Sequence, residues 1–237
     1  MSLLTDRPAA PAATRLPPLA DWLRHAGAVS VMRDGRSVAA HYGSAATELA
    51  VCVKGVGLAF RSDLETLGLS GHPAWLDHVL GKALGVRVPA AGSATAMAGA
   101  LCCRVDDEHA VVVASASAAA RWRRIAREAI VVGNPITFAD RSADLTALTV
   151  VGPRARALLA AVGLEADLAP GTVRTAAPAG APVVLVREHG KRFLLVVDGA
   201  GADTVWRALV RAGAPLGLAL VGTDALARLA AAERTFV

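Results

Sequence analysis

Few side chains in this sequence have the spacing that a metal site or an activated nucleophile requires. The six histidines include no pair at positions i and i+4 of a helix, and no cysteine lies at metal-ligand spacing from them. No serine lies in a nucleophile-elbow sequence. Cys102 and Cys103 are adjacent in a predicted strand, so we expect them on opposite faces of a sheet as core residues. A reactive thiol would need a neighbouring cation, for which Arg104 is the nearby candidate. We therefore expect no metal site.

A cluster of arginines at positions 121, 123, 124 and 127 could bind a polyanion. The formal net charge of +5 also raises the question of nucleic acid binding. Aromatic residues make up only 4% of the chain, so side chains for base stacking are scarce. Arg123 and Arg127 also fall opposite the apolar face of their predicted helix, where charged residues are usually solvated. We expect no nucleic acid partner, whereas a polyanionic small ligand would use the same arginines.

Two glycine-containing segments could present backbone N–H groups to an anion. Residues 198–203 precede a predicted helix, and a strand-to-helix turn capped by Asp203 is the favoured interpretation there. Residues 54–58 lack the third glycine of a dinucleotide-binding loop. Neither segment predicts a phosphate site.

The cysteine content and the distribution of apolar residues indicate the cellular compartment in which the protein is found. Three cysteines, two of them adjacent, cannot form a disulfide framework, which predicts a reducing cytoplasm. No charge-free apolar run reaches the roughly 18 residues of a membrane-spanning helix, so we expect no membrane segment. Residues 1–27 begin rich in proline and alanine without the apolar core of a signal peptide, and we expect a flexible tail there.

The elements that must position any site occur twice in the same order. Residues 67–75 return as 148–156 around a shared glycine, and residues 122–129 return as 206–213 around a shared tryptophan. Each copy predicts strand, helix, strand, strand, helix and strand. This order is typical of a βαββαβ unit of ferredoxin-like type.

The last helix of each copy has one apolar face. Trp122, Ile125, Ala126 and Ala129 in the first copy have the same spacing as Trp206, Leu209, Val210 and Gly213 in the second. Offsets of 0, 3, 4 and 7 lie on one side of a helix, so we expect these residues to be buried. The alternating strand that begins each copy ends at Gly71 or Gly152.

Several segments together resemble a known superfamily. The chain resembles the folate-binding superfamily of the glycine cleavage T-protein, and in its middle it is similar to the gamma subunit of heterotetrameric sarcosine oxidase. The segments that carry the resemblance occur in the family's order, at residues 41–48, 55–62, 67–76, 138–159, 167–171, 182–197, 202–213 and 217–237. The sequence ends where the T-protein would begin its C-terminal barrel, so we expect an open channel wall unless a partner supplies it.

The resemblance implies tetrahydrofolate as a possible cofactor, but the acids that would hold it are replaced. Ala98 and Gly99 stand where the T-protein has paired aspartates, one of which orients the reacting amine. Leu194 stands where the family has the glutamate that binds the pterin ring, and Ala114 replaces a family asparagine. Arg187 matches an arginine of both relatives, although a surface salt bridge is the simpler account.

Three functions follow as hypotheses, and whether the chain is an enzyme stays open. It is an accessory or subunit of a larger complex in one-carbon or amine metabolism, with a protein partner or a second copy of itself. Alternatively, it is a stand-alone enzyme that has reused the folate cavity for a more apolar small molecule. Thirdly, it is a tetrahydrofolate-dependent one-carbon transferase in which the arginine helix meets the glutamate tail.

The second hypothesis needs acid–base and binding groups from elsewhere in the chain. The candidate catalytic residues are His41, Glu48 and His189, with Asp106 as a further acid, and the candidate cofactor-binding residues are Arg61 and Arg187. Each is also an ordinary loop or surface residue type. Their places in the fold must decide between these two roles.

The predicted fold class is α+β, with tandem duplicated βαββαβ units whose antiparallel sheets pack against each other. The family resemblance implies that residues 28–58 join the second copy. We therefore expect residues 28–58 plus 138–237 to form a discontinuous first subdomain, with residues 59–137 as an inserted second subdomain. We expect a small-molecule ligand in the cleft between them.

Overall fold

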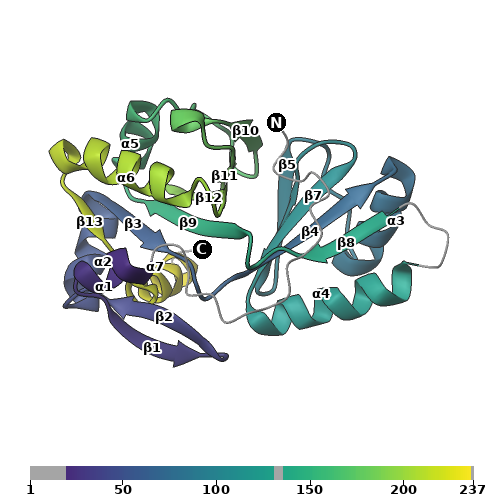
Figure 1. Cartoon of the computed structure of the whole chain (residues 1–237), viewed down its shortest axis with the longest axis horizontal. Coiled ribbons are helices and arrows are strands. Elements are labelled where there is room, and N and C mark those ends of the chain that lie inside the picture. Colours follow the sequence, from purple (N-terminus) through teal and green to yellow (C-terminus); the bar gives the residue numbers. More distant parts are fainter. Residues whose placement is uncertain (1–19, 131–135, 236–237) are drawn as a thin grey trace.

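The computed structural model describes residues 20–130 and 136–235, whose strands form two large sheets and one separate hairpin. Figure 1 shows the two large sheets in two lobes that lie side by side. We call residues 20–60 and 145–235 the main lobe and residues 65–140 the inserted lobe. The chain crosses between the lobes twice, after β3 and after β8. The fold is therefore α+β with largely antiparallel sheets, as predicted.

The main lobe contains the six-stranded sheet and the hairpin. The sheet has the order β10 (Val173–Ala176), β11 (Val183–Arg187), β12 (Arg192–Asp198), β9 (Leu145–Val151), β3 (Val56–Phe60) and β13 (Leu218–Leu220). The hairpin pairs β1 (Val29–Arg33) with β2 (Arg36–His41). The helices of this lobe are α1 (Ala20–His25), α2 (Ala45–Lys54), α5 (Ala155–Ala161), α6 (Ala202–Gly213) and α7 (Thr223–Thr235), with 3-10 turns at Pro178–Gly180 and Ala214–Leu216.

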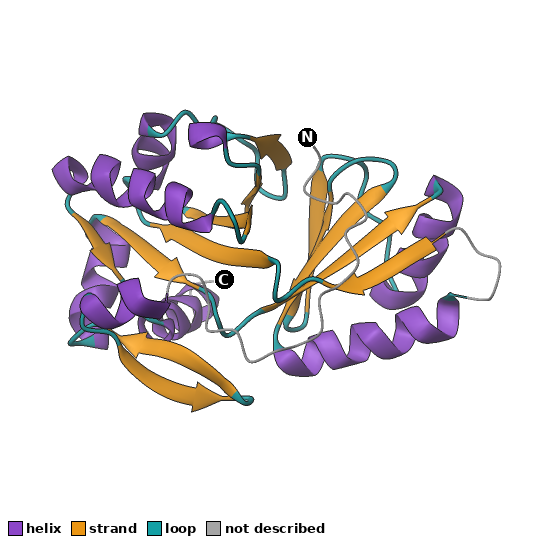
Figure 2. Cartoon of the chain, viewed as in Figure 1, coloured by secondary structure: helices purple, strands orange, loops and turns teal. Residues whose placement is uncertain are grey.

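The inserted lobe contains the five-stranded sheet and two long helices. Its order is β5 (Ser93–Met97), β6 (Ala100–Arg104), β7 (His109–Ala114), β4 (Glu65–Gly71) and β8 (Ile136–Asp140). The helices are α3 (Pro73–Leu84) and α4 (Ala116–Ala129). Figure 2 shows both helices on the side of this sheet that faces away from the main lobe.

Corresponding strands of the two predicted copies have the same neighbours in their sheets. In the inserted lobe the order β6, β7, β4, β8 is that of a ferredoxin-like unit, with β5 added at the edge. In the main lobe β11, β12 and β9 repeat this order, but β3 takes the place beside β9 and pairs in parallel with β13. The shared order favours a duplication, which stays a prediction.

Apolar side chains fill four layers: one outside each sheet, one between the sheets, and a smaller one between the main sheet and helices α2 and α7. The middle layer joins residues of the inserted lobe, such as Cys103 and Val111, to residues of the main lobe, such as Val184 and Val196. The two sheets therefore pack against each other, as the sequence predicts. Cys102 lies in the helix-covered layer of the inserted lobe, so the adjacent cysteines do face opposite sides of their sheet.

Helices α4 and α6 bury the faces that their spacing predicts. Trp122 and Trp206 are 1% and 0% exposed, respectively. The turn before α6 differs from the prediction, because Gly201 precedes the helix and the carboxylate of Asp203 binds Arg207 at 2.9 Å instead of capping the helix. An i,i+4 pair within the helix therefore replaces the expected cap.

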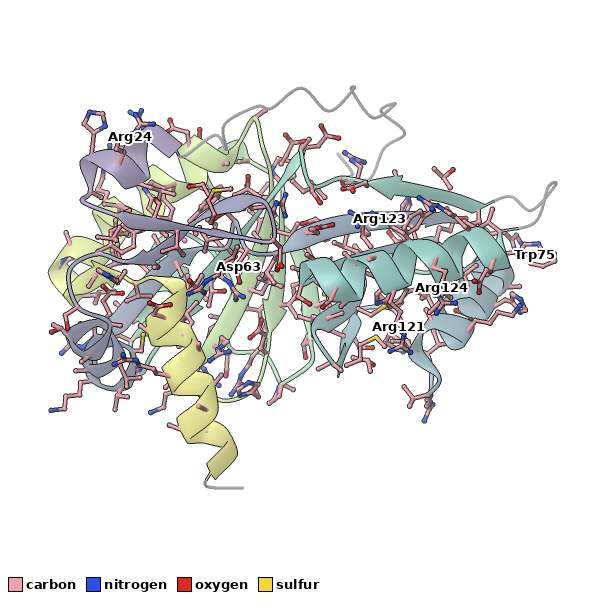
Figure 3. The ribbon with its side chains drawn as sticks, turned by 90° about the horizontal axis from the view of Figure 1, so that it is seen from below. Arg24, Asp63, Trp75, Arg121, Arg123 and Arg124 are labelled. Atoms are coloured by element: carbon pink, nitrogen blue, oxygen red, sulfur yellow. The ribbon has the colours of Figure 1, made fainter. Side chains whose placement is uncertain are left out.

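The arginines of α4 do not form one cationic surface. Figure 3 shows Arg121, Arg123 and Arg124 on this helix in the inserted lobe. Arg123 binds Glu65 of β4 and Asp140 of β8, and Arg124 pairs with a glutamate one turn along. The two ion pairs of Arg123 tie α4 to its own sheet, whereas the Arg124 pair lies within the helix.

The ion pair between Asp140 and Arg123 makes the stability of the folded protein depend on pH. Burial alone would raise its pKa, but hydrogen bonds from Ser142 and the charge of Arg123 outweigh burial and lower the pKa below 3.8. Because the folded pKa is below the unfolded one, this stabilisation is present above about pH 4 and is lost as pH falls through the folded pKa.

We expect the melting temperature of Asp140→Asn to fall less on acidification than that of the wild type. Asp167→Asn, at a carboxylate that is 89% exposed, is the control and should follow the wild-type curve. A steep acid loss retained in Asp140→Asn would contradict this assignment.

The borders of the lobes differ slightly from those expected from sequence. Residues 136–140 pair with β4 as strand β8, so residues 138–140 belong to the inserted sheet. Residues 20–25 form helix α1, and Leu23 is buried against the main core, which the expected tail over residues 1–27 did not include. Residues 1–19 lie outside the described part. We propose that the two lobes correspond to the two subdomains, with their border just after Asp140.

Within the described ranges, no helix has the length and apolar character needed to cross a bilayer.

Candidate functional site

A cleft of about 730 Å³ lies where the two lobes meet. The inserted lobe contributes a wall of small and apolar residues from β5, β6 and β7, among them Met97, Leu101 and Val113. The connection from β3 to β4 and, in the main lobe, β11, β12 and the turn between them contribute a charged wall. Its charged and titratable residues are Arg61, Asp63, Arg187, Glu188, His189 and Arg192. The cleft therefore offers an apolar surface opposite a row of ionic groups.

Arg61 and Asp63 form a pair of parallel hydrogen bonds. Nε and Nη2 of Arg61 donate to the two carboxylate oxygens of Asp63, each at 2.8 Å. Burial would lower the pKa of Arg61, but Asp63 and the charge of Glu188 raise it above its usual value. Figure 3 places Asp63 near the junction of the lobes. This arginine is fully charged, and its fork is largely occupied by its own neighbour.

Arg187 ends β11 and is anchored by backbone carbonyls. Nη1 donates to the carbonyl of Leu168, and Nη2 donates to that of Gly190 at 3.4 Å. Its Nε is buried and has no hydrogen-bond partner. Arg187, the arginine that the resemblance singled out, therefore lines the cleft and has one N–H donor, Nε, without an acceptor among the described residues.

A second group of charges surrounds Arg192 at the start of β12. Its Nη2 donates to Glu233 of α7 at 3.3 Å, and its Nε lies 3.7 Å from Glu188, beyond hydrogen-bond distance. Arg192 is only 8% exposed, and its Nε also lacks a partner. His189 lies at the rim, 63% exposed, with Nδ1 3.7 Å from the same Glu233 carboxylate.

Glu48 lies outside the cleft lining, where it joins three segments of the main lobe. Its carboxylate accepts hydrogen bonds from the backbone N–H of Tyr42 at 2.6 Å and of Gly222 at 2.7 Å. Gly222 approaches β2 so closely that an added Cβ would lie 2.0 Å from the carbonyl oxygen of Ala40. Glu48 is 5% exposed and therefore holds the start of α7 against β2 and α2.

The other candidate residues serve local turns. Nδ1 of His41 accepts from the backbone N–H of Gly43 at 3.2 Å. The carboxylate of Asp106 accepts from the backbone N–H of Glu108 and contacts His109 at 2.8 Å. Neither His41 nor Asp106 lines the cleft. The structure thus brings together Arg61, Arg187 and His189, and it places the remaining candidates elsewhere.

Sequence reasoning missed Asp63, Glu188 and Arg192. The available signal was the run of charges between two apolar strands, from Arg187 to Arg192, at the position where a hairpin must turn. Arg192 precedes Phe193 where the resembling family segment has glycine, so the resemblance gave no reason to choose it. No sequence pattern marked Asp63, because its role depends on its hydrogen bonds with Arg61, two residues earlier.

The donor set of the cleft does not fit a pterin ring. Gly99 and Leu194 both line the cleft, at two positions where the resemblance implies acids in the family. The two carboxylates that do line it, Asp63 and Glu188, lie against arginines. A pterin edge presents N–H donors and needs a free acceptor. In the described lining, Asp63 is held by two hydrogen bonds from Arg61 and Glu188 lies 3.7 Å from Nε of Arg192, so neither carboxylate lies clear of a guanidinium.

The cysteine thiols are unreactive in this fold. Burial raises the pKa of Cys52 to about 11 and that of Cys102 to about 12, and it also raises the pKa of Cys103 well above the usual value of a thiol. The nucleophilic thiolate is therefore scarce near neutral pH. All three cysteines are free, buried and spread over three core layers.

We expect the native protein to resist Ellman's reagent at pH 8, whereas three thiols per chain should react after denaturation in guanidinium chloride. Rapid modification of the native protein would contradict the burial described above. The Cys52→Ser variant serves as a check on the count, because it should lose one thiol only in the denatured sample.

Comparison with known proteins confirms the resemblance found in the sequence. The aminomethyltransferase T of the glycine cleavage system from Bartonella henselae superimposes with a TM-score of 0.69 at 19% sequence identity. That match covers 88% of this chain and 59% of the other, so this chain spans little more than half of that protein. No match was found among curated proteins.

A chain of the heterotetrameric sarcosine oxidase from Corynebacterium sp. U-96, solved in complex with pyrrole 2-carboxylate, is similar as well. Its TM-score is 0.61 at 19% identity, and the match covers 87% of this chain and 98% of that one. At such identities the structures show a shared fold. The model of the GCVT N-terminal domain matches residues 19–236. Because that match spans nearly the whole chain, the protein belongs to the GCVT N-terminal domain family.

Proposed function

We propose that this chain is an accessory protein or subunit of a larger complex in one-carbon or amine metabolism, whose cleft binds a ligand without converting it. The observation that carries this proposal is that both carboxylates in the cleft lining lie against arginines. A general base must have an oxygen free to accept a proton, and both oxygens of Asp63 already accept hydrogen bonds from Arg61. The family's own acids are replaced by Gly99 and Leu194 at the cleft surface.

A partner is supported by the outer hairpin of the main lobe. All five residues of β1 are exposed, and they include Val29, Val31 and Met32, the last of which is 70% exposed. Figure 1 shows β1 as the outer strand of the hairpin at the edge of the lobe. An exposed strand with apolar side chains is a common protein contact surface. The sarcosine oxidase relative is named as a heterotetramer, and its matched chain is almost fully covered by this one.

The partner we propose is a flavin-dependent amine oxidoreductase, and we place the complex in the cytoplasm, since the three cysteines are unpaired. A tagged chain purified from its native cells should retain such an enzyme in a fixed ratio, recognised by mass spectrometry, flavin absorbance and oxidation of N-methylated amines.

The double variant Val31→Ser, Met32→Ser should lose the partner while its melting temperature stays close to that of the wild type. Val53→Ser, at a residue on α2 that is 55% exposed, is the control and should retain it. Recovery of the chain alone, or only as a homo-oligomer, would refute the partner.

A stand-alone enzyme is the second candidate, because a cleft of about 730 Å³ with an apolar wall persists. Its acid–base group would be His189, the one titratable side chain in the lining besides the arginines and their carboxylates. Turnover of a small amine or acid by the isolated chain, abolished in His189→Gln, would favour this candidate over the accessory role.

A further inference from the structure

Two arginines in the cleft have Nε donors without a hydrogen-bond acceptor among the described residues. Arg187 and Arg192 line the same cleft from neighbouring strands, and the Nε of each is buried; that of Arg192 lies 3.7 Å from the Glu188 carboxylate, beyond hydrogen-bond distance. Arg192 is more than nine-tenths buried. A buried donor without an acceptor is unfavourable, and more so when the group is charged. These guanidinium groups are therefore places where an incoming acceptor gains a hydrogen bond.

The surrounding contacts hold both side chains at the cleft. Arg187 is fixed through its terminal nitrogens by the carbonyls of Leu168 and Gly190, and Arg192 is fixed by Glu233. Side chains held in this way lose little entropy when a ligand binds. Arg61 differs, because its fork already binds Asp63.

The unpaired guanidinium donors of the lining, more than its net charge, favour an anion over a cation. Three arginines and two carboxylates line the cleft, and Glu233 on α7, which contacts Arg192 at 3.3 Å, brings the formal sum to zero. Guanidinium groups bind carboxylates through charge-assisted hydrogen bonds that are stronger than those to neutral acceptors.

The apolar wall of the inserted lobe favours a ligand whose remaining part is apolar. Met97, Leu101 and Val113 present apolar surface, and the neighbouring residues Ala96 and Gly99 leave room beside them. Ligand clefts of this kind bury an apolar body and orient it with a few polar groups.

We propose that the cleft binds a small organic carboxylate, with its apolar body against the inserted lobe and its carboxylate on Arg187 and Arg192. This site is separate from the partner surface on β1, and it applies whether the chain acts alone or in a complex. Binding to the isolated chain therefore tests it independently of the proposed partner.

The test compares an acid with its neutral amide. Indole-3-acetate and indole-3-acetamide have the same apolar body, and calorimetric titration of the full chain measures both. A charge-assisted hydrogen bond is worth about 1.5–3 kcal/mol, so we expect the acid to bind at least about tenfold more tightly than the amide.

The variants assign that preference to the two arginines. Arg187→Met removes one guanidinium, and Arg192→Lys keeps the charge near Glu233 while removing the planar fork. Each should weaken indole-3-acetate binding about tenfold and change indole-3-acetamide binding by less than about twofold. Arg124→Met, at an exposed arginine of α4, removes the same charge far from the cleft and should leave both affinities unchanged.

Three results would overturn the proposal. They are equal affinity for acid and amide, no binding of the acid up to about 10 mM, and undiminished acid binding in both Arg187→Met and Arg192→Lys. Because the lysine variant retains the ion pair with α7, a folding defect in one variant does not remove the test.

Discussion

Gly222→Ala is expected to destabilise the protein by about 3 kcal/mol or more. The added Cβ would lie 2.0 Å from the carbonyl oxygen of Ala40 and 2.6 Å from the backbone nitrogen of His41. Both obstacles are backbone atoms, so no side chain can move aside to relieve them. The start of α7 would have to shift, and the hydrogen bond from Gly222 to Glu48 would be lost with it.

The matched control is Gly81→Ala within helix α3. There the new Cβ would meet a valine methyl at 3.7 Å, which is ordinary contact. Alanine favours a helix over glycine by about 1 kcal/mol, so this variant should be slightly more stable than the wild type. Chemical denaturation followed by circular dichroism measures both. Similar stabilities for Gly222→Ala and the wild type would show that α7 does not pack against β2 as described.

Glu48→Ala is expected to cost about 3–5 kcal/mol, because it leaves one buried and one partly buried backbone N–H group without an acceptor. Those donors belong to Tyr42 and Gly222, so the loss separates α2, β2 and α7 at one point. Glu128→Ala removes a carboxylate that is 61% exposed and should cost less than about 0.5 kcal/mol. A small effect of Glu48→Ala on the denaturation midpoint would mean that its carboxylate is not structural, which would reopen a catalytic role.

The fold was predictable wherever local periodicity determined it. The faces of α4 and α6 follow from the spacing around Trp122 and Trp206, and the opposite orientations of Cys102 and Cys103 follow from strand alternation. The neighbour of β9 is a different kind of property. A ferredoxin-like unit would place β13 beside β9, but β3 lies there instead. That choice depends on contacts between segments far apart in the sequence, which local sequence patterns do not encode.

The site was less predictable than the fold. Arg61, Arg187 and His189 could be named as candidates, and all three line one cleft. Whether a carboxylate is a base or an ion-pair partner depends on what faces it, and Asp63 shows this at 2.8 Å from Arg61. Glu48 has the residue type of a catalytic acid, yet its two acceptors are used by backbone donors from distant segments. Such partners are set by tertiary packing.

The described residues have the family's fold, and Gly99 and Leu194 line the cleft at positions where the resemblance implies acids in the family. Gly99 and Leu194 leave apolar surface there, while Arg187 and Arg192 place guanidinium groups on the opposite wall. A cleft of this composition favours an organic acid over a pterin. The proposed accessory role and the proposed carboxylate site both depend on this combination of an apolar wall and a wall with arginines.

Calorimetric titration of tetrahydrofolate into the isolated chain under reducing conditions tests this claim most directly. The ligand's pterin finds no carboxylate clear of a guanidinium in the described lining, so we expect no saturable binding up to about 1 mM. Saturable binding with a dissociation constant below about 100 µM would contradict the account, since the cleft would then hold the family's cofactor without the family's acids.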